Sequence, residues 1–283
     1  MSESAVRCFL VAVEGPREIP AEAANLDTHS LTLPRGAYTT FRTYHRIMAP
    51  RLTEHLDRLT ASAALDGYDL FLDHRAARAA IDEAVRRAGF AESRVRLTLT
   101  YESAGLLYVA VAPFTPLPER LYTEGAHCVT APPGLRRENP RAKGTSFIGP
   151  GSQARAGLTT AHELLLLSPE GAILEGSSSN FFAILSGVLH TAEEGVLVGT
   201  TRNLVLGRAE GLLPIERRPV SVSELSAVQE AFLTSVSRGV LPVTKINQVQ
   251  IDRGRPGPIT QELARRLRVA VEATLEPLED LAE

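Results

Sequence analysis

Only two side chains in this sequence carry a primary amine, so chemistry that needs one must use them. Lysine accounts for two of the 30 basic residues, Lys143 and Lys245, and arginine accounts for the rest. A lysine amine can attack a carbonyl carbon and form an imine, whereas the guanidinium of arginine stays protonated and cannot. Imine chemistry in this protein therefore has two possible centres.

A single carboxylate stands beside a run of small polar residues in EGSSSNFF, residues 175–182. Glycine, serine and asparagine let the backbone approach a ligand closely, so Glu175 could act on a bound molecule. The ordinary alternative is a solvated hairpin loop with Glu175 as an exposed acid. The segment alone favours that alternative, and a functional role for Glu175 needs support from elsewhere in the chain.

Two further places could bind an anion. The sequence GTTR, residues 199–202, precedes a helix-like stretch, and the free N–H groups of a helix N-terminus attract negative charge. Thr200 or Thr201 could instead only cap that helix. Arg58 lies in EHLDRL on a predicted amphipathic helix, where most arginines are simply solvated.

These residues need a scaffold, and the hydrophobic patterns predict a mixed one. In the first part, an α+β unit is expected, with strands at 5–13, 36–44, 94–100 and 106–113 and helices after Pro50 and at 74–89. The second half is strand-rich. Short strands are predicted near 126–131, 163–168, 172–174 and 180–185, and helices at 202–211 and 258–274.

Proline marks the expected domain boundary, because PFTPLPER (113–120) carries three prolines in six residues. The sequence therefore predicts a small N-terminal domain at 1–114, a linker at about 115–120 and a larger domain at 121–283.

Composition excludes several function classes. A net charge of -3 argues against a nucleic-acid partner, since phosphate backbones are bound by clustered basic charge. Cys8 and Cys128 lack the spacing of a metal site, and no metal is predicted. The N-terminal stretch suits a strand better than a signal peptide, and no apolar run would span a membrane. We expect a cytoplasmic location.

Taken in order, six motifs resemble one family, the class IV aminotransferases, also called fold-type IV pyridoxal phosphate enzymes. This family includes branched-chain and D-amino-acid aminotransferases and aminodeoxychorismate lyase. The resemblance covers nearly the whole chain. Its parts are EHLDRLTASA (54–63), PRAKGTSF (140–147), EGSSSNFF (175–182), GVLVGTTRNLVL (195–206), EAFLTSVSRGVLPV (230–243) and GRPGPITQEL (254–263).

The resemblance implies a fold and a cofactor. The fold is a small α/β domain and a larger strand-rich domain with a pseudo-barrel and flanking helices, with pyridoxal 5'-phosphate between the domains. Lys143 matches the lysine that forms the Schiff base, and Glu175 matches the acid that pairs with the pyridine nitrogen. Lys245 lies in a less constrained part of the pattern and is interpreted as a surface residue.

Other matches concern the rest of the cofactor. Arg58 resembles the phosphate-binding arginine, and Thr201, with Thr200 at the same helix start, resembles the phosphate cup. Leu197 stands at the place of a leucine that packs on the cofactor ring, with Asn180 in the loop beneath. In the second phosphate-contacting turn, Val236 replaces a common threonine, so Ser235 or backbone N–H groups would have to contribute.

Departures from the family concern the substrate. Branched-chain enzymes have a tyrosine where this chain has Ile148, and the Arg-x-His pair of D-amino-acid enzymes is missing from YESAGLLY (101–108). Tyr38 agrees with a substrate-site tyrosine, while Thr39 replaces the acid after it. Arg96 and Arg238 are candidates for a substrate carboxylate, with structural ion pairs as the alternative.

The resemblance predicts an aminotransferase that moves an amino group between an amino acid and a 2-keto acid by ping-pong kinetics on Lys143, as a homodimer. One alternative is a lyase that releases pyruvate from aminodeoxychorismate with the same lysine. Another is a non-catalytic protein that binds the cofactor.

Overall fold

The computed structural model describes residues 6–102 and 105–279. Ala5, in a predicted strand, and Ser103 and Ala104, in a predicted turn, lie outside the described residues. The chain forms two compact units. The first comprises Met1–Thr115, Ala142–Gly149 and Glu272–Glu283, and the second comprises Pro116–Arg141 and Pro150–Val271.

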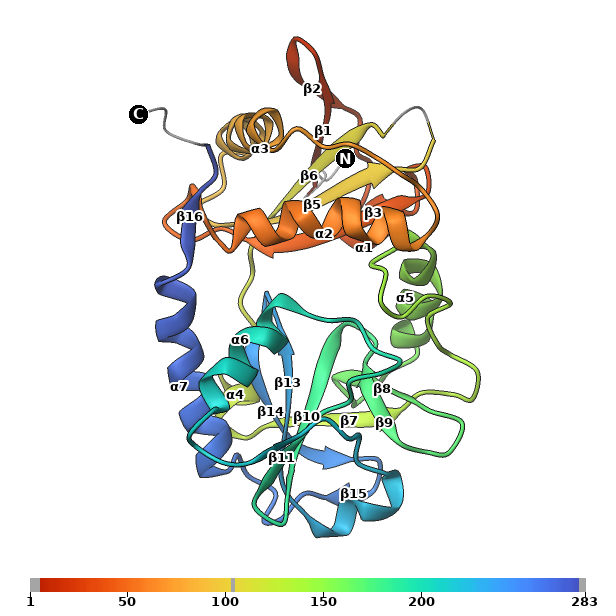
Figure 1. Ribbon diagram of the computed structural model, residues 1–283, viewed down its shortest axis with the longest axis vertical. Helices are drawn as coiled ribbons and strands as arrows, with labels where there is room; N and C mark the ends of the chain where they lie inside the picture. The colour runs from red at the N-terminus through yellow and green to blue at the C-terminus, as the bar shows by residue number, and fades with distance from the viewer. Residues whose placement is uncertain (1–5, 103–104, 280–283) are drawn as a thin grey trace. The chain divides into compact units, whose positions relative to one another are not determined.

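The first unit is built on an antiparallel sheet of order β2-β1-β6-β5-β3. Helix α2 packs on β3 and β5, and α3 packs on β1, β2 and β6 (Figure 1). The elements are β1 (Arg7–Ala12), β2 (Gly15–Ile19), α1 (Leu26–Ser30), β3 (Gly36–Arg42), β4 (Met48–Pro50), α2 (Leu52–Leu65), α3 (His74–Ala88), β5 (Ser93–Thr100), β6 (Leu107–Pro113), η1 (Thr145–Phe147) and β16 (Leu275–Pro277).

Helix α2 forms where the sequence predicted it because leucines at helical spacing cover one face. Leu52, Leu56 and Leu59 are fully buried, while the positions between them include exposed polar residues. Helix α3 begins at Asp73, whose carboxylate accepts two N–H groups of the first turn, and ends at Gly89 with a left-handed backbone (φ 73°). The buried leucines therefore place α2 against the sheet, and the two caps define the ends of α3.

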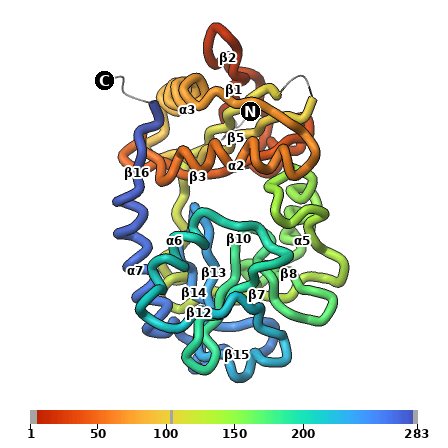
Figure 2. Tube along the Cα trace, in the orientation of Figure 1, coloured from red at the N-terminus to blue at the C-terminus, as the bar shows by residue number. Residues whose placement is uncertain are grey.

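The second unit contains a closed ring of six strands. Strands β10, β13, β14, β7, β8 and β9 pair in that order, and β9 pairs back with β10. This confirms the predicted pseudo-barrel. Figure 2 labels β7, β8, β10, β13 and β14 along the chain trace of this unit. The elements are α4 (Arg120–Thr123), β7 (Ala126–Thr130), α5 (Ile148–Ala156), β8 (Glu163–Leu167), β9 (Ile173–Gly176), β10 (Ser179–Leu185), β11 (Val188–His190), α6 (Thr200–Ala209), β12 (Ile215–Glu216), η2 (Val222–Ala227), β13 (Val228–Ser235), β14 (Gly239–Ile246), β15 (Val249–Gln250) and α7 (Pro258–Glu272).

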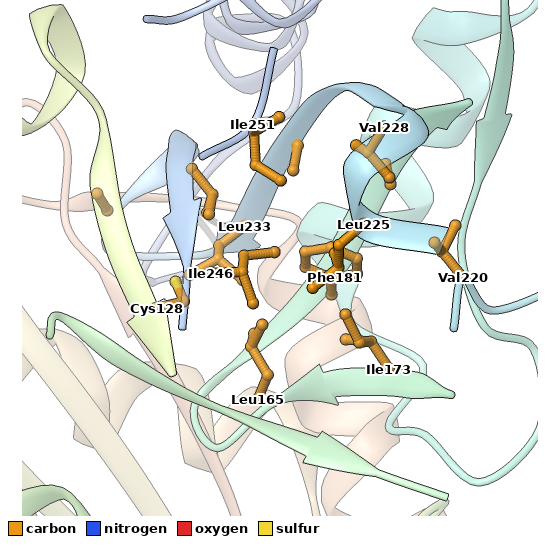
Figure 3. Packing of buried hydrophobic residues seen from close by; sticks show 14 of the residues in the cluster. Cys128, Leu165, Ile173, Phe181, Val220, Leu225, Val228, Leu233, Ile246 and Ile251 are labelled. Atoms are coloured by element: carbon orange, nitrogen blue, oxygen red, sulfur yellow. The ribbon is translucent and has the colours of Figure 1, made fainter. Parts of the chain in front are cut away.

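Strand β10 contributes to two cores because successive side chains point to opposite faces. Phe181 joins Leu233 and residues from the other barrel strands in the interior cluster shown in Figure 3. Phe182 joins a second cluster with residues of α6 and α7, and its ring stacks on Phe232 at 4.9 Å. The barrel is therefore filled inside and covered by helices outside.

Candidate active site

Lys143 lies on the loop before η1, within the first unit, and its peptide is held by two neighbouring elements. Its N–H donates to Ser62 Oγ of α2 (3.1 Å), and its carbonyl accepts the N–H of Tyr38 on β3 (2.8 Å). A bridge between Ala37 and Gly144 continues this pairing. The amine thus extends from a fixed backbone, which favours a precise role.

Tyr38 is nearly buried and lies beside this amine. Lys143 Nζ is 4.8 Å from the centroid of the Tyr38 ring, which is a cation–π distance. The guanidinium of Arg96 lies 4.9 Å from the same ring. Arg96 itself donates to Asp27 at 2.8 Å and to three neutral oxygens, an arrangement that favours the structural ion pair over a substrate contact.

Among residues 6–102 and 105–279, no carboxylate forms an ion pair with the positively charged side chain of Arg58. Its Nη2 donates to Thr39 Oγ1 (2.6 Å) and to His55 Nδ1 (3.0 Å), both neutral acceptors. Burial lowers the pKa of Arg58 to about 10, a value at which the group remains charged at neutral pH. A bound anion would stabilise this guanidinium.

His55 can accept from Arg58 because its ring is neutral. Burial lowers the pKa of His55 well below 6.5, and the charges of Arg58, Lys143 and Arg51 lower it further. Since Arg58 can only donate, Nδ1 is the acceptor and the proton resides on Nε2. Nδ1 also lies 2.7 Å from Thr39 Oγ1, so Thr39, His55 and Arg58 form one polar cluster.

Glu175 lies at the end of β9 in the second unit and is only 2% exposed. The interpretation of this residue as an ordinary exposed acid is therefore wrong. Its Oε1 accepts Arg137 Nε at 2.8 Å, and its Oε2 accepts the N–H of Leu197 at 3.1 Å.

Asn180 stands opposite Glu175 on β10 and completes this arrangement. Its Nδ2 donates to the carbonyl of Leu197 at 2.7 Å. The backbone of Leu197 therefore connects the Glu175 carboxylate with the Asn180 amide. A Cβ at Gly199 would lie 2.3 Å from Asn180 Oδ1, which explains why the residue before α6 is glycine. The loop that enters α6 is thereby packed against Asn180.

Helix α6 begins with two buried threonines, Thr200 and Thr201, and no side chain caps it at Gly199. The first N–H groups of a helix have no partner within it. An uncapped N-terminus in buried surroundings is suited to an anion such as a phosphate.

The turn between β13 and β14 contains the remaining predicted residues. Ser235 and Val236 are half-buried, and Ser235 Oγ accepts Arg238 Nε at 2.9 Å. Arg238 Nη1 donates to Glu163 at 3.0 Å, which favours a structural ion pair for this arginine also. Lys245 lies farther along β14, opposite Gln250, and is half-buried.

Sequence reasoning missed three residues that contact these side chains. Arg137 comes from a loop with no recognisable pattern, and Glu163 comes from a strand read only for its apolar residues. His55 had a usable signal, because it precedes Arg58 by three positions on a helix and so shares its face.

No group of three or more potential metal ligands occurs in the part of the chain that the structure describes. Among the same residues, no helix is both long and apolar enough to cross a membrane.

Comparison with known proteins gives a consistent result. The family model for amino-transferase class IV matches residues 36–246. A Thermotoga maritima protein named "Probable branched-chain-amino-acid aminotransferase" is 31% identical over 250 residues, covering 82% of this chain and 85% of its own. The D-alanine aminotransferase of Bacillus licheniformis is 28% identical over 263 residues, covering 88% and 92%.

A solved structure shows the same fold. It is a "T.th." branched-chain amino acid aminotransferase crystallised with pyridoxamine 5'-phosphate, and it superposes with a TM-score of 0.77 at 23% identity. The match covers 96% of this chain and 98% of that one.

Proposed function

Because the chain belongs to the class IV aminotransferases, we propose that it moves an amino group between an amino acid and a 2-keto acid through a Schiff base on Lys143. Enzymes of this family depend on pyridoxal 5'-phosphate, which when bound supplies an electron sink for the bond broken at the substrate's Cα. The lyase alternative has no support among the relatives described above, which are named as aminotransferases.

The observation that carries the proposal is the environment of Glu175. A buried carboxylate that accepts from Arg137 and from a backbone N–H is stabilised in its charged form. Such an acid can keep a pyridine nitrogen protonated. We assign it that role, with Leu197 and Asn180 fixing the loop beside it.

The phosphate would be held by charge and by backbone donors. The buried guanidinium of Arg58 lacks an acidic partner among the described residues, and the start of α6 offers free N–H groups at Thr200 and Thr201. Each of these two features is suited to an anion. The turn at Ser235 and Val236 is proposed as a further contact.

Lys143 would hold the cofactor and then move the proton at the substrate's Cα, since its amine is the reactive group on the fixed loop. Tyr38, beside that amine, is proposed to line the substrate site with Thr39. The relatives include both branched-chain and D-alanine aminotransferases, so the substrate is proposed only as an amino acid of one of these classes. A homodimer is proposed for the assembly.

Borohydride reduction followed by peptide mass spectrometry tests the assignment of the lysine. The purified protein with pyridoxal phosphate should carry the reduced pyridoxyl group on Lys143. Label on Lys245 alone would contradict the proposal. Lys245→Arg is the matched control, because it should retain activity, whereas Lys143→Arg should lose it by roughly 10³-fold.

A single-turnover panel of L- and D-amino acids tests the reaction itself. Conversion of the bound cofactor to its amine form by a branched-chain L-amino acid or by a D-amino acid, with release of the keto acid, is expected. Absence of this conversion with every amino acid would support the non-catalytic alternative. Light scattering of the same preparation measures the oligomeric state.

A further inference from the structure

Glu163 is a charged residue with no exposed surface, and its side chain is surrounded by hydrogen-bond donors. It lies at the start of β8 in the second unit, and its side chain accepts from the hydroxyls of Ser177 (2.5 Å), Ser178 (2.5 Å) and Ser179 (3.3 Å). Ser177 and Ser178 form the turn between β9 and β10, and Ser179 is the first residue of β10. The three serine side chains therefore donate to the same carboxylate.

The same carboxylate reaches a second turn through Arg238. Arg238 Nη1 donates to Glu163 Oε2 at 3.0 Å, and Nε donates to Ser235 Oγ at 2.9 Å. Its Nη2 donates to the carbonyl and the hydroxyl of Ser178, both at 2.8 Å. The turn at Ser177–Ser179 and the turn at Ser235–Gly239 are thus joined by one ion pair between a buried carboxylate and a half-buried arginine.

A further hydrogen bond leads from the first turn to the candidate catalytic acid. Arg137 Nη2 donates to the carbonyl of Ser177 at 3.3 Å, while its Nε donates to Glu175 at 2.8 Å. Movement of Ser177 would therefore shift Arg137 and, with it, the charge beside Glu175.

Glu163 stays ionised in this environment. Burial alone would raise its pKa, but the charge of Arg238 and the hydroxyls of Ser177 and Ser178 hold the pKa below the ordinary value. Neutralising the side chain would leave Arg238 without its counter-charge and would turn one of the two acceptor oxygens into a donor, which is costly for hydroxyls that donate to it.

We propose that Glu163 is a positioning residue that joins the turn at Ser177–Ser179 to the turn at Ser235–Gly239 and so prepares both for the cofactor. The inference rests on the proposed function, in which the first turn follows Glu175 and the second contributes Ser235 and Val236 to the phosphate. Glu163 acts through Arg238 and the serines, without itself touching the cofactor.

Glu163→Gln tests this role with two measurements. Amide hydrogen exchange on the cofactor-free protein should accelerate in both turns together. The dissociation constant for pyridoxal phosphate should rise roughly 10- to 100-fold, as expected when hydrogen bonds to a charged group are lost. Protection unchanged in either turn, or an unchanged dissociation constant, would overturn the proposal.

Glu230→Gln is the matched control, because Glu230 is a buried acid of the same unit that binds a different element. Its oxygens accept the N–H groups of Ile259 (3.1 Å) and Thr260 (2.7 Å) at the start of α7. This variant should accelerate exchange at the start of α7 and leave cofactor affinity within about twofold. An equal loss of affinity in Glu230→Gln would show that Glu163 contributes only general stability.

Ser178→Ala provides a milder change if Glu163→Gln does not fold. It removes one donor to Glu163 and one acceptor of Arg238, and exchange should again rise in both turns. If the unmodified protein does not bind pyridoxal phosphate, the proposed function fails. The exchange comparison on the cofactor-free protein would still decide whether Glu163 couples the two turns.

Discussion

Glu175 and Arg137 form a buried ion pair. Burying such a pair requires the desolvation of both charges, and removing one partner destabilises the folded protein. Glu175→Gln keeps the size of the side chain and removes its charge. We expect turnover to fall by on the order of 10²-fold, because the amide cannot keep the pyridine nitrogen protonated, while cofactor affinity falls less. Stopped-flow measurement of the first half-reaction and a cofactor titration separate the two effects.

Breaking the ion pair should also lower the stability of the Glu175→Gln variant. Urea unfolding of this variant and of Glu230→Gln, measured together, accounts for that contribution. If Glu230→Gln loses turnover as strongly as Glu175→Gln, the specific role of Glu175 is refuted.

Arg58 offers a test that depends on the phosphate alone. The wild-type protein should bind pyridoxal phosphate far more tightly than pyridoxal, because the guanidinium lacks an acidic partner among the described residues. Arg58→Met should reduce this preference by roughly 10- to 100-fold and leave the affinity for pyridoxal nearly unchanged. Fluorescence titration with both ligands measures the preference, and equal losses for both ligands would contradict the assignment.

The residues of the candidate site differ in how far the sequence could predict them. Lys143 could be proposed from the sequence because only two lysines exist and one lies within a family motif. Arg137 and Glu163 were not, since their importance comes from partners 38 and 14 or more positions away, brought together by folding. A sequence pattern records residue types but not these pairings.

At the scale of elements, two glycines of one segment give opposite predictions. Gly199 precedes α6, and a Cβ there would lie 2.3 Å from Asn180 Oδ1, whereas a Cβ at Gly207 within α6 would meet nothing within 4 Å. Gly199→Ala should lower the free energy of unfolding by about 1–3 kcal/mol, because Asn180 must move and its bond to Leu197 weakens.

Gly207→Ala should instead raise the free energy of unfolding by about 0.5–1 kcal/mol through the greater helix propensity of alanine. Urea unfolding midpoints of the two variants provide the measurement. A neutral Gly199→Ala would mean that the packing of Asn180 against the start of α6 contributes nothing to stability.

Many elements were predictable because their patterns are local, but others, among them β2, α5 and β13, were not predicted. The leucines of α2 and strands β1, β3, β5 and β6 of the first sheet follow the helical and strand periods, and their observed bounds differ from the predicted ones by a few residues. Closure of the barrel was different. The parallel pairings of β14 with β7 and of β7 with β8 join segments far apart in the sequence, whose contact no local pattern encodes.

At the scale of the whole molecule, each compact unit is made of segments that are not consecutive in the sequence. Residues Ala142–Gly149, which include Lys143, group with the N-terminal part, as does Glu272–Glu283. A proline-rich segment is visible in the sequence as a possible linker. The sequence does not show that a later segment packs with the N-terminal part. The division predicted at 115–120 remains a prediction about domains.

Acid should destabilise the whole protein in two stages. Burial lowers the pKa of His29, His55 and His162 below 6.5, so the folded state keeps these rings neutral while the unfolded state binds protons. Their contribution to stability is complete above pH 6.5 and is lost as the pH falls below that value. Carboxylates with lowered pKa, such as Glu163 and Glu276, add a second loss below about pH 4.5.

His55→Gln isolates the first stage. The glutamine oxygen can still accept from Arg58, but the side chain no longer takes up a proton on unfolding, so the free energy of unfolding should fall less between pH 7 and pH 5 than in the wild type. His45→Gln is the control, because the His45 side chain is 67% exposed. Urea titrations at several pH values give the slopes. A slope for His55→Gln equal to that of the wild type would mean that the neutral ring of His55 does not govern acid stability.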